Sequence, residues 1–213
     1  MIKKISNIKF WNTYYKNSFD DKNSSFSKWA LSKINNKNDI IDIGCGNGRD
    51  SFFFSKYFKN VYGADKSKVA INKNRIKVKD NFFKNILFYQ QDFSKKKFFS
   101  KKKFINIYAR FFLHTLNYKE EFFFLNNLQK ISKKNSLFFL EFRTVKDPMM
   151  RYGQKISKYE RVHGHYRRFI NTDDFILALK NLNFEIIQIT TSNKFSVYRG
   201  QKPNLARILF RRK

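Results

Sequence analysis

The sequence predicts an α/β fold: a seven-stranded, mostly parallel sheet with helices on both faces, formed by one domain over residues 1–213. Short apolar segments alternate with amphipathic helical segments for at least five rounds along the chain, and such alternation builds a parallel sheet covered on both sides. The last two apolar segments follow each other without a helix between them, so the last strand should pair antiparallel.

The first 37 residues are expected to form a helical cap in two pieces, at 8–16 and 26–34. Aromatic side chains recur at helical spacing in both pieces. Ser24 or Ser25 precedes the second piece and is a candidate N-cap. The aromatic stripe of the first piece, formed by Trp11, Tyr14 and Tyr15, is interpreted by default as a packing face.

The remaining strands and helices are predicted from the spacing of apolar residues, which recur every two residues in a strand and about every 3.6 residues in a helix. Strands are expected at 40–43, 61–64, 86–89, 104–108, 137–142, 185–191 and 205–210. Helices are expected at 49–58, 67–80, 118–131 and 172–182. Residues 144–169 fit no regular element, and an irregular segment of that length is usually functional, so we expect it to cover a substrate.

The chain is strongly basic, with 45 Lys and Arg against 16 Asp and Glu and a net charge of +29. Such a charge attracts polyanions, which leaves a nucleic-acid partner open. The Lys residues are scattered through every segment, however, and the abundance of Lys, Asn, Phe and Ile is typical of an A/T-rich genome. We therefore favour a compositional origin of the charge.

Several classes of protein are disfavoured by composition. The single cysteine, Cys45, excludes an intramolecular disulfide and a multi-cysteine zinc site, and we expect no metal. No apolar run approaches the ~20 residues of a membrane helix, and no apolar segment of a signal peptide follows the N-terminus. A cytoplasmic protein is expected, and its oligomeric state is left open.

Chemistry is expected where the first strands end. The first strand runs into the glycine-rich segment 42–48, which reads DIGCGNG and opens a helix. Asp65 closes the second strand and Asp92 follows the third. Ligands of open parallel sheets bind beyond the carboxyl ends of the strands, and carboxylates around a glycine loop suit a ligand that bears an amine, a ribose and an adenine. Each acid could instead cap a turn or helix.

These motifs resemble the class I S-adenosylmethionine-dependent methyltransferases, over about residues 25–213. The matching segments are 42–48, 62–65 and 89–92. The resemblance implies a Rossmann-like seven-stranded sheet and S-adenosyl-L-methionine as cofactor. It implies that Asp42 and the loop near Gly44 and Gly46 hold the methionine end, that Asp65 binds the ribose hydroxyls, and that Asp92 meets the adenine amine. The cofactor set is expected to comprise Asp42, Gly44, Cys45, Gly46, Asp65, Lys66, Asp92, Phe93 and Tyr108. In this family an N-terminal helix often covers the cofactor, so the aromatic stripe is alternatively a lid.

The acceptor should face the segment 108–114, which follows the fourth strand. The segment lacks the Asn-Pro-Pro-Tyr motif of exocyclic amino methylation, and Cys45 lies in the cofactor loop, which excludes a cysteine-adduct mechanism on cytosine. Segments 108–114, 141–143 and 165–169 are similar to a narrower group of bacterial methyltransferases that act on small molecules or are associated with surface polysaccharides.

Arginines and histidines from three segments should converge over the cofactor, and Arg binds carboxylates and phosphates through two parallel hydrogen bonds. The acceptor is therefore expected to be a small molecule with a carboxylate or phosphate. Its predicted contacts are Arg110, His114, Arg143, His165, Tyr166 and Arg168. The predicted catalytic residues are His165, as the base if one is needed, Arg110 and Glu141.

Alternatives remain for these residues. One of Arg167 and Arg168 could be buried in a salt bridge while the other is solvated, and His114 could be a packed core histidine. The alternative functions are an RNA methyltransferase and a non-catalytic protein that binds S-adenosylmethionine.

Overall fold

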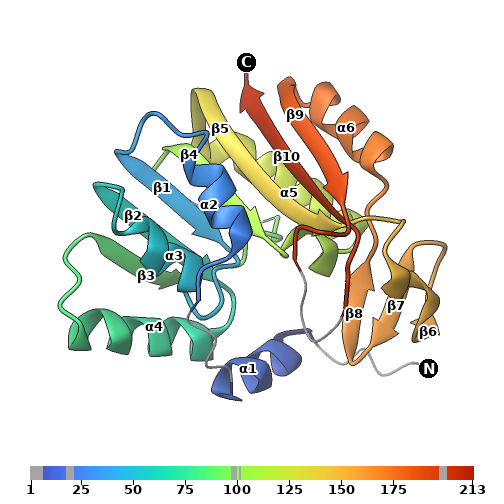
Figure 1. Ribbon diagram of the computed structural model, residues 1–213, viewed down its shortest axis with the longest axis horizontal. Helices are drawn as coiled ribbons and strands as arrows, with labels where there is room; N and C mark the ends of the chain where they lie inside the picture. Colours follow the sequence, from blue (N-terminus) through green and yellow to red (C-terminus); the bar gives the residue numbers. More distant parts are fainter. Residues whose placement is uncertain (1–6, 18–21, 97–99, 101, 197–200) are drawn as a thin grey trace.

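The structure is a computed structural model that describes residues 7–17, 22–96, 100, 102–196 and 201–213. Its main sheet has seven strands in the order β3-β2-β1-β4-β5-β10-β9 (Figure 1). Strand β10 runs antiparallel to both of its neighbours, and the other neighbouring pairs are parallel. The predicted mostly parallel sheet with an antiparallel last strand is confirmed.

The strands of the main sheet are β1 Asp39–Ile43, β2 Asn60–Asp65, β3 Ile86–Gln90, β4 Phe104–Arg110, β5 Ser132–Arg143, β9 Phe184–Ser192 and β10 Leu205–Arg212. The helices are α1 Asn7–Asn17, α2 Ser25–Leu31, α3 Arg49–Phe54, α4 Lys68–Asp80, α5 Tyr118–Ile131 and α6 Thr172–Asn181. Helix α3 ends four residues before the predicted end, and β5 begins five residues before the predicted start. Of the predicted N-terminal cap, residues 1–6 and 18–21 lie outside the described residues.

Local sequence signals set the starts of the helices. Ser24 caps α2 by accepting a hydrogen bond from the amide of Ser27, as expected from its side chain. Ser67 caps α4 in the same way. Helix α5 begins with a capping box, in which Asn117 and Glu120 exchange side-chain to backbone hydrogen bonds.

The core lies in two layers, one on each face of the sheet. Side chains alternate between the faces of a strand, so adjacent residues such as Phe138 and Phe139 of β5 enter different layers. One layer packs under α5 and α6, and the other packs under α2, α3 and α4. This arrangement places helices on both faces, as the sequence predicts.

The segment 144–169 is structured, and the prediction of an irregular segment is wrong. It contains a short 3₁₀ helix, Pro148–Arg151, and a second sheet in the order β6-β7-β8, with strands Gln154–Lys155, Glu160–His163 and His165–Arg168. These strands are two to four residues long and rich in charged side chains, so they lack the alternation of apolar and polar residues that identifies a strand. Gly164, with φ +73°, makes the tight turn between β7 and β8.

The order of the strands places the topological switch point of the sheet between β1 and β4. The chain moves outward from β1 through β2 to β3 and then resumes on the other side of β1 with β4. Such a switch point separates the loops beyond the carboxyl ends of the strands and opens a ligand site there. The small sheet and α1 lie at this same edge of the main sheet (Figure 1).

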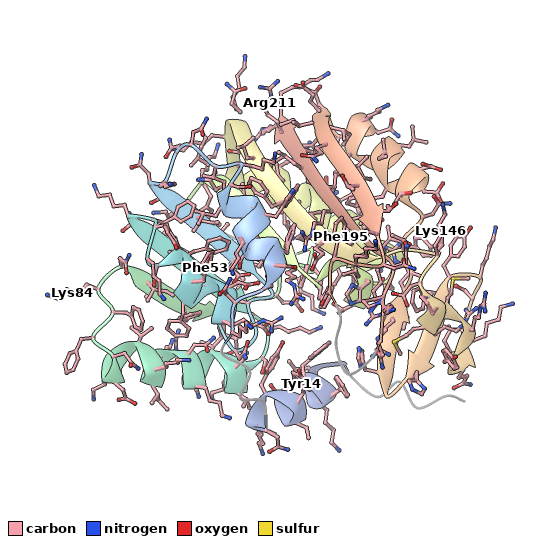
Figure 2. All side chains as sticks on the ribbon, viewed as in Figure 1. Tyr14, Phe53, Lys84, Lys146, Phe195 and Arg211 are labelled. Carbon is pink, nitrogen blue, oxygen red and sulfur yellow. The ribbon has the colours of Figure 1, made fainter. Side chains whose placement is uncertain are left out.

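Basic side chains are distributed around the whole molecule. Figure 2 shows nitrogen-tipped side chains all along the outline, with Lys84 and Lys146 at opposite sides of the view. No helix in the described ranges is long and apolar enough to cross a membrane.

Gly63 offers a test of the packing between β2 and β3. A methyl group on Gly63 would lie 2.3 Å from two ring carbons of the buried Phe88. We expect Gly63→Ala to lower the free energy of unfolding by about 1–3 kcal/mol, as overpacked cores do. Urea unfolding measures the loss, with the exposed Lys84→Ala as control. Equal stability of the two variants would contradict this packing.

Candidate functional site

The glycine-rich segment forms a tight loop between β1 and α3. The amides of Gly44 and Cys45 both donate to the carbonyl of Ala64 on β2, at 2.8 and 3.1 Å. Gly44 and Gly46 have φ of +71° and +53°, a backbone region that glycine enters without strain. The loop therefore lies close against the end of β2, beside Asp65.

Asp65 is buried at the end of β2 and is held by the backbone on both sides. Its two carboxylate oxygens accept hydrogen bonds from the amide of Gly46 at 3.0 Å and from the amide of Ser67 at 2.7 Å. Burial raises the pKa of Asp65, and these two hydrogen bonds, together with the charge of Lys66, oppose the rise. Each oxygen keeps a lone pair for a further donor.

Asp42 is a buried carboxyl group beside a second one, Asp50. The hydroxyl of Ser51 donates to Asp42 at 2.6 Å. Burial, and then the charge of Asp50, raise the pKa of Asp42 to about 8. Asp42 is therefore largely protonated at neutral pH, and a cation placed beside it would favour its ionised form.

Asp50 was not predicted from the sequence, although it organises the floor of the site. It accepts hydrogen bonds from the Ser24 amide at 2.6 Å, the Ser24 hydroxyl at 2.7 Å and the Tyr108 hydroxyl at 2.7 Å. Tyr108, a predicted cofactor residue, is fully buried, and its ring packs against Phe26 and Phe54. The structure thus places the Tyr108 phenol in the core.

The other predicted cofactor residues have local roles. Asp92 accepts hydrogen bonds from the amide and hydroxyl of Ser94, which is the turn-capping alternative. The ring of Phe93 is buried in the core layer under α5. The thiol of Cys45 is buried as well, and burial raises its pKa well above the usual value, so it behaves as a small filler.

Helix α1 lies across the site between α4 and β8 (Figure 1). Asn12 accepts a hydrogen bond from the Ser67 hydroxyl at 2.6 Å. The rings of Phe10 and Trp11 pack on His165, with centroid separations of 4.3 and 5.0 Å. The helix therefore contacts the Asp65 side and the small sheet at once, and the aromatic stripe lies over the site.

Arg110 and Glu141, two predicted catalytic residues, form a buried ion-paired group with Arg207. Glu141 accepts from Arg110 Nε at 2.9 Å and from Arg207 Nε at 2.8 Å. Both carboxylate oxygens are thus used within the protein. Glu141 positions Arg110 at the end of β4, where Arg110 lies over the ring of Phe111.

Four basic residues gather between the end of β5 and the small sheet. Arg143 pairs with Asp147 at 2.8 Å, and its amide donates weakly to His114 Nδ1 at 3.4 Å. Arg167 donates to the carbonyl of His163 at 2.8 Å. His165 lies on the same face of β8 as Arg167, because the two are two residues apart.

Burial and neighbouring charges keep both of these histidines neutral. Burial, and then Arg167 and Arg143, lower the pKa of His165 to about 3. Burial, and then Arg143 and Arg167, lower the pKa of His114 well below its usual value. Each imidazole can therefore accept a proton, and neither adds positive charge at neutral pH.

Tyr166 and Arg168, two predicted acceptor contacts, lie on the opposite face of β8. Arg168 is buried, donates to the Leu116 carbonyl at 3.0 Å and pairs with Glu121. The Tyr166 hydroxyl donates to Glu160. The alternative that one of the two adjacent arginines is buried in a salt bridge therefore holds for Arg168. Arg167, absent from the predicted acceptor set, is the one that lies with Arg143 and His165.

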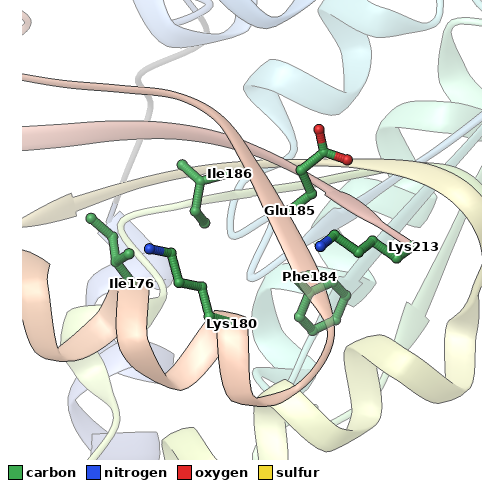
Figure 3. A pocket seen from close by; sticks show the side chains of 6 residues that line it. All are labelled: Ile176, Lys180, Phe184, Glu185, Ile186 and Lys213. Carbon is green, nitrogen blue, oxygen red and sulfur yellow. The ribbon is translucent and has the colours of Figure 1, made fainter.

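A surface hollow lies away from this site. About 570 Å³ in volume, it lies between α6 and the start of β9 and is lined by Ile176, Lys180, Phe184, Glu185, Ile186 and Lys213 (Figure 3). It contains none of the residues at the carboxyl ends of β1, β2 or β4. Within the described ranges, no group of three or more His, Cys, Asp or Glu side chains is arranged to hold a metal ion.

The raised pKa of Asp42 predicts a pH dependence of stability. Between its usual value of 3.8 and about 8, the folded chain keeps a proton that the unfolded chain releases, so stability should fall as pH rises through this window, by up to about 1.4 kcal/mol per pH unit. The amide side chain of the Asp42→Asn variant cannot ionise, so the variant's free energy of unfolding should change less with pH in this window. Its advantage in stability over the parent should be largest near pH 8. Urea unfolding at pH 5, 6.5 and 8 measures the free energy of unfolding of each variant, with Asp39→Asn as control. Parallel profiles for parent and Asp42→Asn would contradict the prediction.

Known proteins place this geometry in a family. A family defined as "Methyltransferase domain" matches residues 15–189, whereas a search of curated proteins finds no match. An S-adenosylmethionine-dependent methyltransferase from Clostridium acetobutylicum has 13% identity and a TM-score of 0.72, with 96% of each chain covered. The glycopeptide N-methyltransferase MtfA, solved with S-adenosylmethionine, has 14% identity and a TM-score of 0.68, covering 89% of this chain and 93% of that one.

A third similar structure is described as a cyclase. The [4+2]-cyclase SpnF has 11% identity and a TM-score of 0.75, covering 98% of this chain and 95% of that one. At such identities, the similarities to solved structures show the fold alone. The family match spans most of the chain. The chain thus belongs to the class I S-adenosylmethionine-dependent methyltransferases.

Proposed function

We propose that this protein transfers the methyl group of S-adenosylmethionine to a small acceptor that carries an anionic group. The observation that carries the proposal is the group of Arg143, Arg167, His114 and His165 beside the cofactor loop. Two arginines there face one carboxylate, Asp147, and both histidines are neutral. A half-buried site with surplus positive charge is suited to an anion.

The cofactor side of the site fits the family's ligand. Asp65, with lone pairs left on both oxygens, is proposed to bind the ribose hydroxyls. Asp42 and the backbone at Gly44 and Gly46 are proposed to hold the methionine end, where the ammonium group would favour the ionised form of Asp42. The cofactor supplies an activated methyl group on a sulfonium.

Tyr15 fills part of that space in this structure. A methyl group on Gly46 would lie 2.4 Å from the Tyr15 hydroxyl, so the phenol lies directly against the loop. Burial, and then the nearby Asp65 charge, raise the pKa of Tyr15 well above its usual value. The glycine loop and Asp65 fit the cofactor, and Tyr15 must move aside to admit it.

On the acceptor side, alignment and removal of water are the main tasks, because the sulfonium is already a good leaving group. Phe10 and Trp11 cover His165 and exclude water from it. His165 is neutral and is proposed to accept a proton where the acceptor atom carries one. Arg110, held by Glu141, is proposed to face the acceptor from the end of β4.

A second candidate is a catalyst that binds S-adenosylmethionine without transferring its methyl group. The resemblance to SpnF, described as a [4+2]-cyclase, favours it. An RNA methyltransferase is favoured only by the net charge of +29. Phosphate contacts would make RNA binding fall steeply with salt.

One experiment separates these functions. The protein is incubated with methyl-labelled S-adenosylmethionine and either a metabolite extract or total RNA, at 50 and 200 mM salt. Label in small anionic metabolites supports the proposal. Label in RNA alone, lost at high salt, supports the RNA methyltransferase. No transfer, with cofactor binding seen by calorimetry, supports the non-methylating catalyst and contradicts the proposal.

Asp65→Ala tests the cofactor site. Loss of the hydrogen bonds that two ribose hydroxyls donate to the carboxylate should weaken S-adenosylhomocysteine binding about 100-fold, which calorimetry measures. Asp39→Ala is the matched control, because Asp39 lies at the opposite end of β1 beside Lys102. Unchanged affinity in Asp65→Ala, in a variant that thermal unfolding shows to be folded, would refute the assignment.

Tyr15→Ala tests whether the phenol competes with the cofactor. Because the variant leaves nothing to displace from Gly46, S-adenosylhomocysteine should bind about 3–10-fold more tightly, which is a gain of about 1 kcal/mol. Calorimetry measures the change, and Tyr14→Ala, on the exposed side of α1, is the control. Weaker binding in Tyr15→Ala would show instead that the phenol contributes to the bound state.

A further inference from the structure

Arg167 is a half-buried cation beside Arg143. Its guanidinium donates to the His163 carbonyl at 2.8 Å. Among the residues that the structure describes, no carboxylate lies within ion-pair distance of it. Arg168, its neighbour, pairs with Glu121 on the other face of β8. Two adjacent arginines thus have different surroundings, and only one of them has a carboxylate partner.

The surroundings of Arg167 penalise its charge. Burial, and then the positive charge of Arg143, lower the pKa of Arg167 to about 10, while Asp147 acts in the opposite direction. Arg143 already uses Asp147 as its partner at 2.8 Å. A half-buried arginine beside a second arginine is costly unless an anion joins them, so the pair is arranged for a negatively charged ligand.

The net charge of this group indicates which class of anion would bind there. Arg143 and Arg167 bring two positive charges and Asp147 brings one negative charge, which leaves a surplus of one. A carboxylate carries one negative charge and matches it, whereas a phosphate monoester carries about −1.5 to −2 at pH 7. Arg110 shares Glu141 with Arg207 and lies over the ring of Phe111. It is not among the charges that act on Arg167, which are Arg143 and Asp147, so it is left out of this count.

We propose that Arg143 and Arg167 bind a carboxylate group of the methyl acceptor, and that Arg167 determines specificity for it. The inference rests on the proposed function, because it names the chemical group that the acceptor presents. Arg143 is oriented by Asp147 from the end of β5, and Arg167 approaches from β8. The carboxylate lies beside His165, under the rings of Phe10 and Trp11.

The rings of Phe10 and Trp11 over His165 suggest a probe molecule for this site, and Trp11 can report its binding by fluorescence. Trp11 lies 5.0 Å from His165 between ring centroids. Trp29 is the only other tryptophan in the sequence, so Trp29→Phe leaves Trp11 as the single fluorophore. Benzoate is the probe, because it combines one carboxylate with a ring that can pack against Phe10 and Trp11. Inorganic phosphate is the comparison anion.

The test is titration of the Trp29→Phe protein with benzoate, with and without S-adenosylhomocysteine, at constant ionic strength. We expect a saturable change in Trp11 fluorescence. Adding Arg167→Gln or Arg143→Gln should weaken benzoate binding at least tenfold, as loss of a charge-assisted pair does. Lys155→Gln removes one charge from the exposed strand β6 of the same small sheet and should change affinity less than twofold. Phosphate should bind more weakly than benzoate.

Other outcomes overturn the inference. These are no saturable change with benzoate, tighter binding of phosphate, or equal affinities in Arg167→Gln and Lys155→Gln. The readout needs no methyl transfer, so it is separate from the proposed function. Failure of methyl transfer with intact, Arg167-dependent benzoate binding would refute the function and keep the carboxylate site. If the protein transfers methyl groups and Arg167→Gln leaves the KM for the acceptor unchanged, the carboxylate site is refuted and the proposed function stands.

Discussion

The burial of three carboxylates at one edge of the sheet constrains the rest of this structure. Asp42, Asp50 and Asp65 are all withdrawn from water near the ends of β1 and β2, and a buried carboxylate is costly unless it is hydrogen-bonded or protonated. Backbone amides of the glycine loop and of the turn after β2 satisfy Asp65. The start of α2 satisfies Asp50, and Asp42 is held with a raised pKa.

This requirement links segments that are far apart in the sequence. Ser24 caps α2 and also donates to Asp50, so the N-terminal region is fastened to the floor of the site. Ser25 accepts a hydrogen bond from Arg207, which also donates to Glu141. The start of α2 thus contacts both the buried Asp50 and the group formed by Arg207, Glu141 and Arg110.

On the proposed acceptor side, the position of each side chain depends on β8. Successive residues of this strand point to opposite faces of the small sheet. Residues 165–168 read HYRR, a run in which any member could touch a substrate. In β8, His165 and Arg167 face Arg143, whereas Tyr166 and Arg168 make ion-paired and hydrogen-bonded contacts on the other side. The run is typical of a ligand-binding segment, but its two faces cannot be assigned from sequence because the segment lacks the alternation that identifies a strand.

The sequence by itself determined the order of the strands and helices of the main sheet, the antiparallel last strand and the position of the glycine loop with Asp65, because these depend on local period, caps and spacing. The tertiary structure decided which side chains are consumed within the protein and which are free for ligands. Tyr108 and Glu141 are satisfied by Asp50, Arg110 and Arg207, contacts that span 31 to 66 residues of sequence. Likewise, Tyr15 reaches Gly46 only because α1 folds back across the site. Such partners are set by packing between distant segments, which no local pattern encodes.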